Sequence, residues 1–114
     1  MSGNEIHNKL IAELCDAWEA LNADLVEPLL ADDLHYSSWW LMKETHTKDE
    51  YLDYLRGRFQ SIRKSGDPLI VKMGVNRIDG EYAVAIQQGD GMPALIRIVE
   101  KNGKIKEMWM QAAE

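Results

Sequence analysis

The hydrophobic pattern of this 114-residue chain changes its period at Ser65-Gly66-Asp67-Pro68, and this change restricts the possible folds more than any other feature. Before that point, apolar residues recur every three to four positions, as they do on one face of a helix. After it, short apolar segments are separated by the turn pairs Asp79-Gly80 and Asn102-Gly103, which are typical of β-hairpins. Helices followed by antiparallel strands predict an α+β fold.

The segment before the change predicts three helices. The first covers residues 4–21, and a short second helix begins with the capping-box spacing of Asp24 and Glu27. The third covers residues 47–65 and begins with a capping box at Thr47.

Five strands are expected, one of them between the second and third helices. Their predicted ranges are 34–42, 69–78, 81–88, 94–100 and 104–110. The length fits one domain over residues 1–114, long enough to bury an ordinary hydrophobic core.

Charge and cysteine content exclude several classes of protein. Thirteen Lys and Arg against nineteen Asp and Glu give a net charge of −6, which argues against nucleic-acid and anionic-membrane surfaces. The single cysteine, Cys15, allows no internal disulfide, and no His/Glu spacing predicts a metal site. No apolar run approaches the roughly 20 residues of a membrane span, and no signal peptide is visible, so a cytoplasmic location without cofactor is expected.

The order of these motifs resembles a known superfamily. Two helices lead through Leu30-Ala31-Asp32-Asp33 into a strand, and a third helix precedes a meander that contains Asn102-Gly103-Lys104-Ile105. From about Ile6 to Met110 the chain resembles the nuclear transport factor 2-like superfamily, which includes SnoaL-like and ketosteroid-isomerase-like proteins. The resemblance implies three N-terminal helices packed on a strongly curved antiparallel sheet, a cone-shaped half-barrel with a cavity open at one end. It also implies a homodimer formed through the outer face of the sheet.

The chain departs from ketosteroid isomerases where those enzymes carry their catalytic groups. The position of their aspartate general base corresponds to Ser38, and their oxyanion-binding tyrosine lies close to Ala17 and Trp18. A serine hydroxyl without a base of its own does not abstract protons near neutral pH. Steroid isomerisation is therefore not expected.

Several residues fall on elements that line the cavity in the resembled fold. Aromatic walls with a few polar groups are typical of small-molecule pockets, although the same rings could instead fill the core. The predicted ligand-binding residues are Trp18, Tyr36, Ser38, Trp40, Tyr54, Gln88 and Trp109. The sequence leaves open which alternate residues of the last strands face the cavity, because one β-bulge would reverse the alternation.

Acid–base chemistry has two candidates, Tyr36 and His46, and the catalytic residues stay unassigned. His46 lies near Glu44 and fits either a general base oriented by a carboxylate or an exposed loop histidine. Arg97 interrupts an apolar strand and fits either an anion-binding pocket residue or a salt bridge on the outer surface. A basic group on the third helix fits either phosphate binding or a solvated helix face, and the solvated face is expected because nearby acids balance the charge; its members are Arg56, Arg58, Arg63 and Lys64.

Two functions follow as hypotheses. The first is a cofactor-free protein that binds a small apolar or aromatic ligand in an aromatic-lined conical pocket. Such a protein could also be an acid–base enzyme of the isomerase, dehydratase, cyclase or hydrolase class. The second is a non-catalytic homodimeric interaction module whose cavity is filled by its own side chains, for which the apolar segments Trp39-Trp40-Leu41-Met42 and Met108-Trp109-Met110 are the motivation. Peptide recognition is a third reading, without a visible groove.

Overall fold

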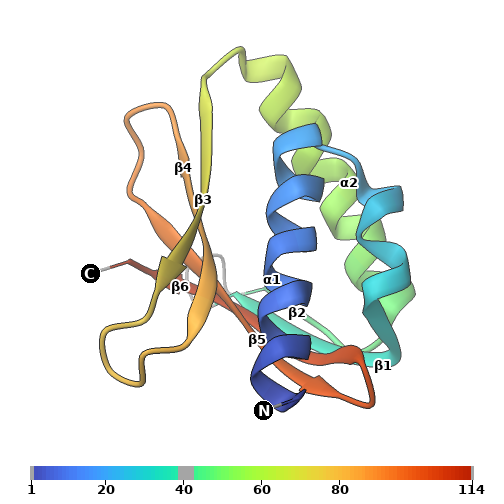
Figure 1. Cartoon of the computed structure of the whole chain (residues 1–114). Helices are drawn as coiled ribbons and strands as arrows, with labels where there is room; N and C mark the ends of the chain where they lie inside the picture. The colour runs from blue at the N-terminus through green and yellow to red at the C-terminus, as the bar shows by residue number, and fades with distance from the viewer. Residues whose placement is uncertain (1, 39–42, 114) are drawn as a thin grey trace.

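The computed structural model describes residues 2–38 and 43–113. Two long helices lie on the same side of a six-stranded sheet (Figure 1). In chain order the elements are α1 (Ser2–Ala20), the 3-10 turns η1 (Ala23–Leu25) and η2 (Glu27–Leu29), β1 (Leu30–Ser38), β2 (Lys43–Thr45), α2 (Lys48–Ser65), β3 (Leu69–Val75), β4 (Tyr82–Gln88), β5 (Ala94–Lys101) and β6 (Lys104–Ala112). The α+β class is confirmed.

The predicted short second helix is wrong, because this segment forms two successive 3-10 turns. Pro28 lies at the start of η2 and has no backbone N–H for an α-helical hydrogen bond. The predicted Asp24 capping box is also not formed. Instead, the Asn22 side chain caps η1 by accepting a hydrogen bond of 3.0 Å from the backbone N–H of Asp24.

The prediction for the third helix is confirmed by α2. The Thr47 hydroxyl accepts a hydrogen bond of 3.2 Å from the Glu50 N–H, and the helix ends at Gly66, whose φ of 71° is left-handed. One apolar face of the helix is buried, and its residues are Tyr51, Leu52, Leu55, Phe59 and Ile62.

The sheet has the strand order β2-β1-β6-β5-β4-β3, and its pairing is antiparallel except between β1 and β6, which are parallel. The sheet is therefore mixed, and the prediction of a purely antiparallel sheet is wrong at this one pair. The reason is that β6 joins β1 only after the chain has passed through α2 and the hairpins, so no local turn determines their relative direction. At the Asn102-Gly103 hairpin the φ angles are 55° and 81°, as expected for this turn pair.

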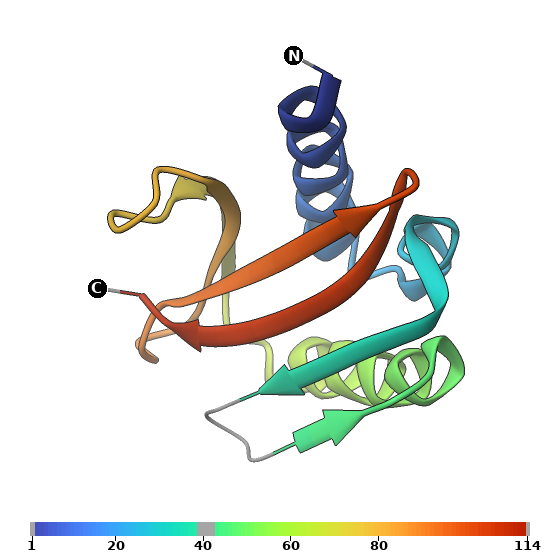
Figure 2. The ribbon, with the colours of Figure 1, turned by 90° about the horizontal axis from the view of Figure 1, so that it is seen from below.

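The sheet bends, so that its two ends contact different helices (Figure 2). The strands β1 and β2 pack on α2, whereas β3, β4 and β5 pack on α1. We call the helix-covered side the inner face and the opposite side the outer face. Alternation along paired strands places Tyr36 opposite Met108 on the inner face and Ser37 opposite Trp109 on the outer face.

Aromatic side chains fill much of the space between the helices and the inner face. The side chains of Trp18, Tyr36, Tyr51 and Phe59 are each about 1% exposed. Within residues 2–38 and 43–113, no helix has the length and hydropathy that a membrane span needs.

Candidate functional site

A cavity of about 230 Å³ lies at the end of the sheet where β3 and β5 begin and where β4 and β6 end. We call it the Arg58 cavity, after the one charged residue among its described lining residues. These residues are Arg58 of α2, Leu69, Ile86, Gln88, Gly91, Met92, Ala94 and Met110. Apart from Arg58, Gln88 and the Gly91 backbone, the wall is apolar.

The polar part of this wall is a fixed pair of side chains. Arg58 Nη1 donates a hydrogen bond of 3.2 Å to Gln88 Oε1, and Gln88 Nε2 donates one of 3.2 Å to Ser65 Oγ. The hydroxyl of Ser65 in turn donates to the carbonyl of Ile62 at 2.8 Å. Gln88 therefore bridges two positions that lie two turns apart on α2, and both ends of its amide are engaged.

The guanidinium of Arg58 is only partly satisfied by the residues that the structure describes. Its Nε is shielded from solvent and has no hydrogen-bond partner among them. A guanidinium stays protonated at every physiological pH, so this cation is permanent.

A cluster of tyrosines lies next to Arg58, between β1 and α2. The ring centroids of Tyr36 and Tyr51 are 4.7 Å apart, and those of Tyr36 and Tyr54 are 5.7 Å apart. The Tyr36 hydroxyl interacts with the side chains of Tyr54 and Ser38 and lies close enough to Arg58 to feel its charge.

Burial keeps these tyrosines protonated. It is the main reason that the pKa of Tyr36 lies well above its usual value, and the neighbouring Tyr54 adds to the increase. The pKa of Tyr51 is likewise raised by burial. At neutral pH, Tyr36 is therefore a hydrogen-bond donor and not a general base.

The structure brings part of the predicted ligand-binding set together. Gln88 lines the Arg58 cavity, and Tyr36, Ser38 and Tyr54 form the hydroxyl cluster near Arg58. Trp18 instead packs edge-on against Phe59 in the core, with ring centroids 4.8 Å apart. Trp40 and the Trp39–Met42 segment lie outside the described residues.

Trp109, one of the predicted ligand-binding residues, lies on the outer face of the sheet, which decides the strand parity that the sequence leaves open. The Asn102-Gly103 hairpin would place Trp109 opposite Ile96 on the inner face, but the register shifts between Val99 and Glu100. After this bulge, Trp109 pairs with Arg97, whose guanidinium carbon lies 5.2 Å from the ring centroid. A wall of aromatic rings was predicted, whereas the described wall of the Arg58 cavity is aliphatic and sulfur-containing.

The interpretation of Arg97 as a salt-bridge residue on the outer surface of the sheet is confirmed. Arg97 forms ion pairs with Asp79 and, at 3.6 Å, with Glu81, both of which lie in the connection between β3 and β4. The Glu81 N–H and Arg97 together hold the pKa of the Asp79 carboxyl below its usual value.

His46 is exposed and does not belong to the described lining of the Arg58 cavity. Glu44 accepts a hydrogen bond from His35 at 2.7 Å, and it lies 3.7 Å from His46, so a carboxylate does accompany this histidine. Among the residues described, no group of three His, Cys, Asp or Glu side chains is arranged to hold a metal ion.

Sequence reasoning missed Arg58, because the expected solvated face included it. Arg58 is half-buried and follows Tyr51 by seven positions and Tyr54 by four, so it continues one side of the buried helical stripe. This spacing is the signal that would have separated it from Arg56, which is exposed and pairs with Asp24 at 3.4 Å.

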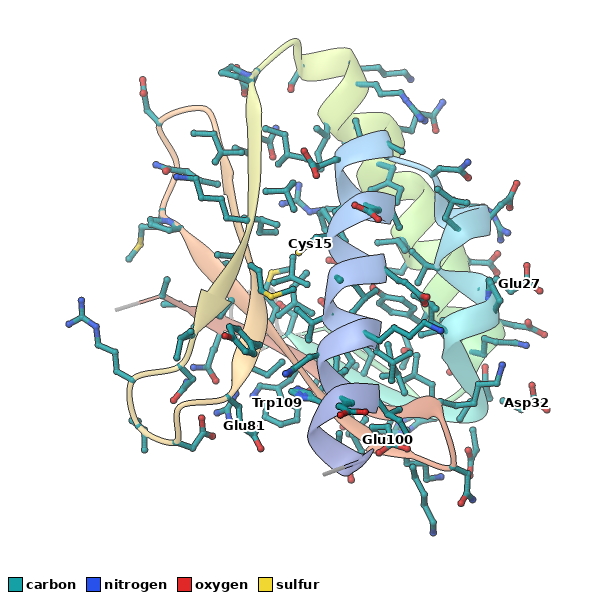
Figure 3. The ribbon with its side chains drawn as sticks, viewed as in Figure 1. Cys15, Glu27, Asp32, Glu81, Glu100 and Trp109 are labelled. Atoms are coloured by element: carbon teal, nitrogen blue, oxygen red, sulfur yellow. The ribbon has the colours of Figure 1, made fainter. Side chains whose placement is uncertain are left out.

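Cys15 is a core residue on the sheet-facing side of α1 (Figure 3). Burial, with smaller contributions from Asp16 and Glu19, raises the pKa of its thiol to about 11. The thiolate population at neutral pH is therefore very small, and this environment does not support a nucleophile.

No protein-family model matches the sequence, and no curated protein matches it. Solved structures match over almost the whole chain. A SnoaL-like protein of unknown function from Burkholderia thailandensis has a TM-score of 0.72 and 17% identity, with 96% of both chains covered. An NTF2-like protein of unknown function from Mesorhizobium loti has a TM-score of 0.75 and 8% identity, with 97% of this chain and 93% of that chain covered.

An LEH-like epoxide hydrolase from M. tuberculosis matches with a TM-score of 0.66 and 18% identity, over 96% of this chain and 84% of that one. Identities in this range report the fold and not the activity. The chain therefore has the fold of the NTF2-like and SnoaL-like proteins.

Proposed function

We propose that the protein binds a small, largely apolar organic molecule in the Arg58 cavity. One observation carries the proposal: aliphatic walls and a fixed Arg58–Gln88 pair line the same hollow. Apolar walls with a few oriented polar groups are typical of small-molecule sites. The volume of about 230 Å³ lies below the roughly 300–1,000 Å³ of pockets for drug-sized ligands, so the ligand is small.

A cavity-filling variant tests this proposal. Ala94 lines the cavity and is 3% exposed, so Ala94→Leu adds three carbon atoms to the wall. Ala31→Leu, at a partly exposed site on β1, is the matched control. Saturation-transfer NMR with 2-naphthamide as the probe is expected to give a signal with the wild type and with Ala31→Leu and a loss with Ala94→Leu. An equal signal in all three proteins would contradict binding in this cavity.

We extend the proposal to acid–base chemistry in which Arg58 stabilises a negatively charged oxygen that forms on the bound molecule, and the buried Tyr36 beside Arg58 acts through it. A protonated phenol beside a permanent cation is suited to this task. The epoxide hydrolase among the structural neighbours suggests styrene oxide as the first substrate to test. We expect diol formation above the buffer rate and a reduced rate with Tyr36→Phe. No diol formation would contradict the hydrolase extension and leave the binding proposal intact.

A second candidate is a non-catalytic homodimer that uses the outer face. The side chains of Trp18, Tyr36 and Phe59 fill much of the interior, which supports this candidate. The apolar side chain of Val99 also supports it, because Val99 is 41% exposed on the outer face beside Trp109. The proposed partner is a second copy of the chain. Sedimentation velocity at micromolar concentration tests it: a dimer that Val99→Arg dissociates supports it, and a monomeric wild type contradicts it.

A further inference from the structure

We propose that the ligand of the Arg58 cavity is an organic monocarboxylate whose carboxylate binds to Arg58. This inference rests on the proposed function and adds the chemical class of the ligand. It follows from two properties of the cavity: a cation without a described counter-ion and an otherwise largely apolar lining.

The charge of Arg58 is not balanced by the residues that the structure describes. Its described hydrogen-bond partner is the neutral amide of Gln88, and no described carboxylate lies within ion-pair distance of it. Arg56 and Arg97, by contrast, each face an aspartate. Half-burying a cation without a counter-ion is costly, and a guanidinium cannot relieve that cost by losing its proton. An anionic ligand supplies the missing charge.

The hydrogen bonds of Arg58 leave it able to bind an anion. Among the described residues, its guanidinium makes one side-chain hydrogen bond, from Nη1 to Gln88. A guanidinium can bind a carboxylate through two parallel hydrogen bonds. Because Gln88 is itself anchored to Ser65, it holds the guanidinium in one orientation.

A single anionic group on an apolar body fits the remaining wall. Leu69, Ile86 and Met110 contact the rest of the volume, and they offer no further charge for a second anionic group. A phosphate dianion would leave one negative charge without a partner in this wall. The lining therefore favours a carboxylic acid with an aliphatic or aromatic body.

Matched acid and amide probes test the inference. 2-Naphthoate and 2-naphthamide have the same shape and differ in charge, as do octanoate and octanamide. Isothermal titration calorimetry on the wild type is expected to give at least about tenfold tighter binding of each acid than of its amide, since hydrogen bonds to charged groups contribute about 1.5–3 kcal/mol.

The variants locate this preference. Arg58→Gln is expected to remove the preference for the acid, and Arg58→Lys to retain part of it. Arg56→Gln, on the exposed side of the same helix, is expected to leave it unchanged. Circular dichroism checks that each variant is folded. If Arg58→Gln does not fold, the comparison of acid and amide affinities for the wild type and for Arg58→Lys still tests the carboxylate assignment.

The outcomes separate the two proposals. Equal affinity for acid and amide, or a preference that survives in folded Arg58→Gln, would overturn the carboxylate assignment while the binding function stands. Binding of none of the four probes to the wild type would contradict the binding function itself, and the carboxylate assignment with it.

Discussion

Arg58 on α2 and Gln88 at the end of β4 are joined by a hydrogen bond of 3.2 Å from Nη1 to Oε1, although 30 residues separate them in the sequence. Through Nε2, the same glutamine also contacts Ser65, so a single amide connects the sheet to two turns of the helix. This connection fixes the polar side of an otherwise apolar cavity. A side chain in this position contributes to stability as well as to the site.

Replacing Gln88 by alanine is therefore expected to destabilise the protein. The change removes two hydrogen bonds and leaves the Arg58 guanidinium without its described partner, so we expect a loss of about 1–2 kcal/mol in the free energy of unfolding. Gln60→Ala, on the exposed surface of the same helix, is the control and should change the value by less than about 0.5 kcal/mol. Urea unfolding measures both, and equal values would show that the bridge contributes nothing.

The buried tyrosines and Cys15 predict a loss of stability at alkaline pH. Their pKa values are raised in the folded protein, so the unfolded chain releases these protons at a lower pH than the folded protein does. A rise in pH therefore stabilises the unfolded state relative to the folded state. The free energy of unfolding should stay level below about pH 9. Above that pH it should fall because the Cys15 thiol of the unfolded chain deprotonates, and above about pH 10 the deprotonation of Tyr36 and Tyr51 in the unfolded chain should add to the fall. Each group contributes a slope of up to about 1.4 kcal/mol per pH unit.

The variant Tyr36→Phe should make this alkaline slope shallower. Ile62→Val removes a buried methylene from the same core and is expected to lower stability by a similar amount at every pH, leaving the slope unchanged. Urea unfolding at a series of pH values from 7 to 11 measures all three proteins. An unchanged slope in Tyr36→Phe would contradict the raised pKa of Tyr36.

Two glycines should respond to alanine in opposite directions. Gly103 has a φ of 81° in the β5–β6 hairpin, where an L side chain is strained, so Gly103→Ala should lower stability by about 1 kcal/mol. Gly57 lies in the middle of α2, and an added Cβ would meet no atom within 4 Å, so Gly57→Ala should raise stability by about 0.5–1 kcal/mol. Thermal unfolding checks both signs, and a stabilising Gly103→Ala would contradict the turn geometry.

The sequence predicted those parts of the fold that depend on local signals. The capping residues around Thr47, the glycine at position 66 and the Asn102-Gly103 turn each act within a few residues, and the structure contains all of them. The parallel pairing of β1 with β6 depends instead on contacts between segments about 70 residues apart, and no local pattern specifies it. Likewise, the short β2 strand exists only because β1 supplies its partner.

The candidate site was predicted only in part, for two physical reasons. One extra residue in β6, at the bulge opposite Val99, reverses the side on which Trp109 lies, and a sequence pattern cannot locate such a residue. Arg58 has the residue type of its exposed neighbours, and only its position on the helix, in line with Tyr51 and Tyr54, distinguishes it from them. That Tyr36 and Ser38 lie on the same face of their strand could be predicted, because they share one parity of an aromatic-rich segment.

Methyl NMR of selectively labelled methionines tests the central claim most directly. Met92 and Met110 line the Arg58 cavity, whereas Met73 is exposed on β3 and Met108 is buried elsewhere in the core. On titration with 2-naphthoate, we predict that the Met92 and Met110 methyl signals shift to saturation, while those of Met73 and Met108 stay within about a tenth of that change. Absence of any shift at Met92 and Met110, or shifts confined to Met73, would contradict a small-molecule site in this cavity.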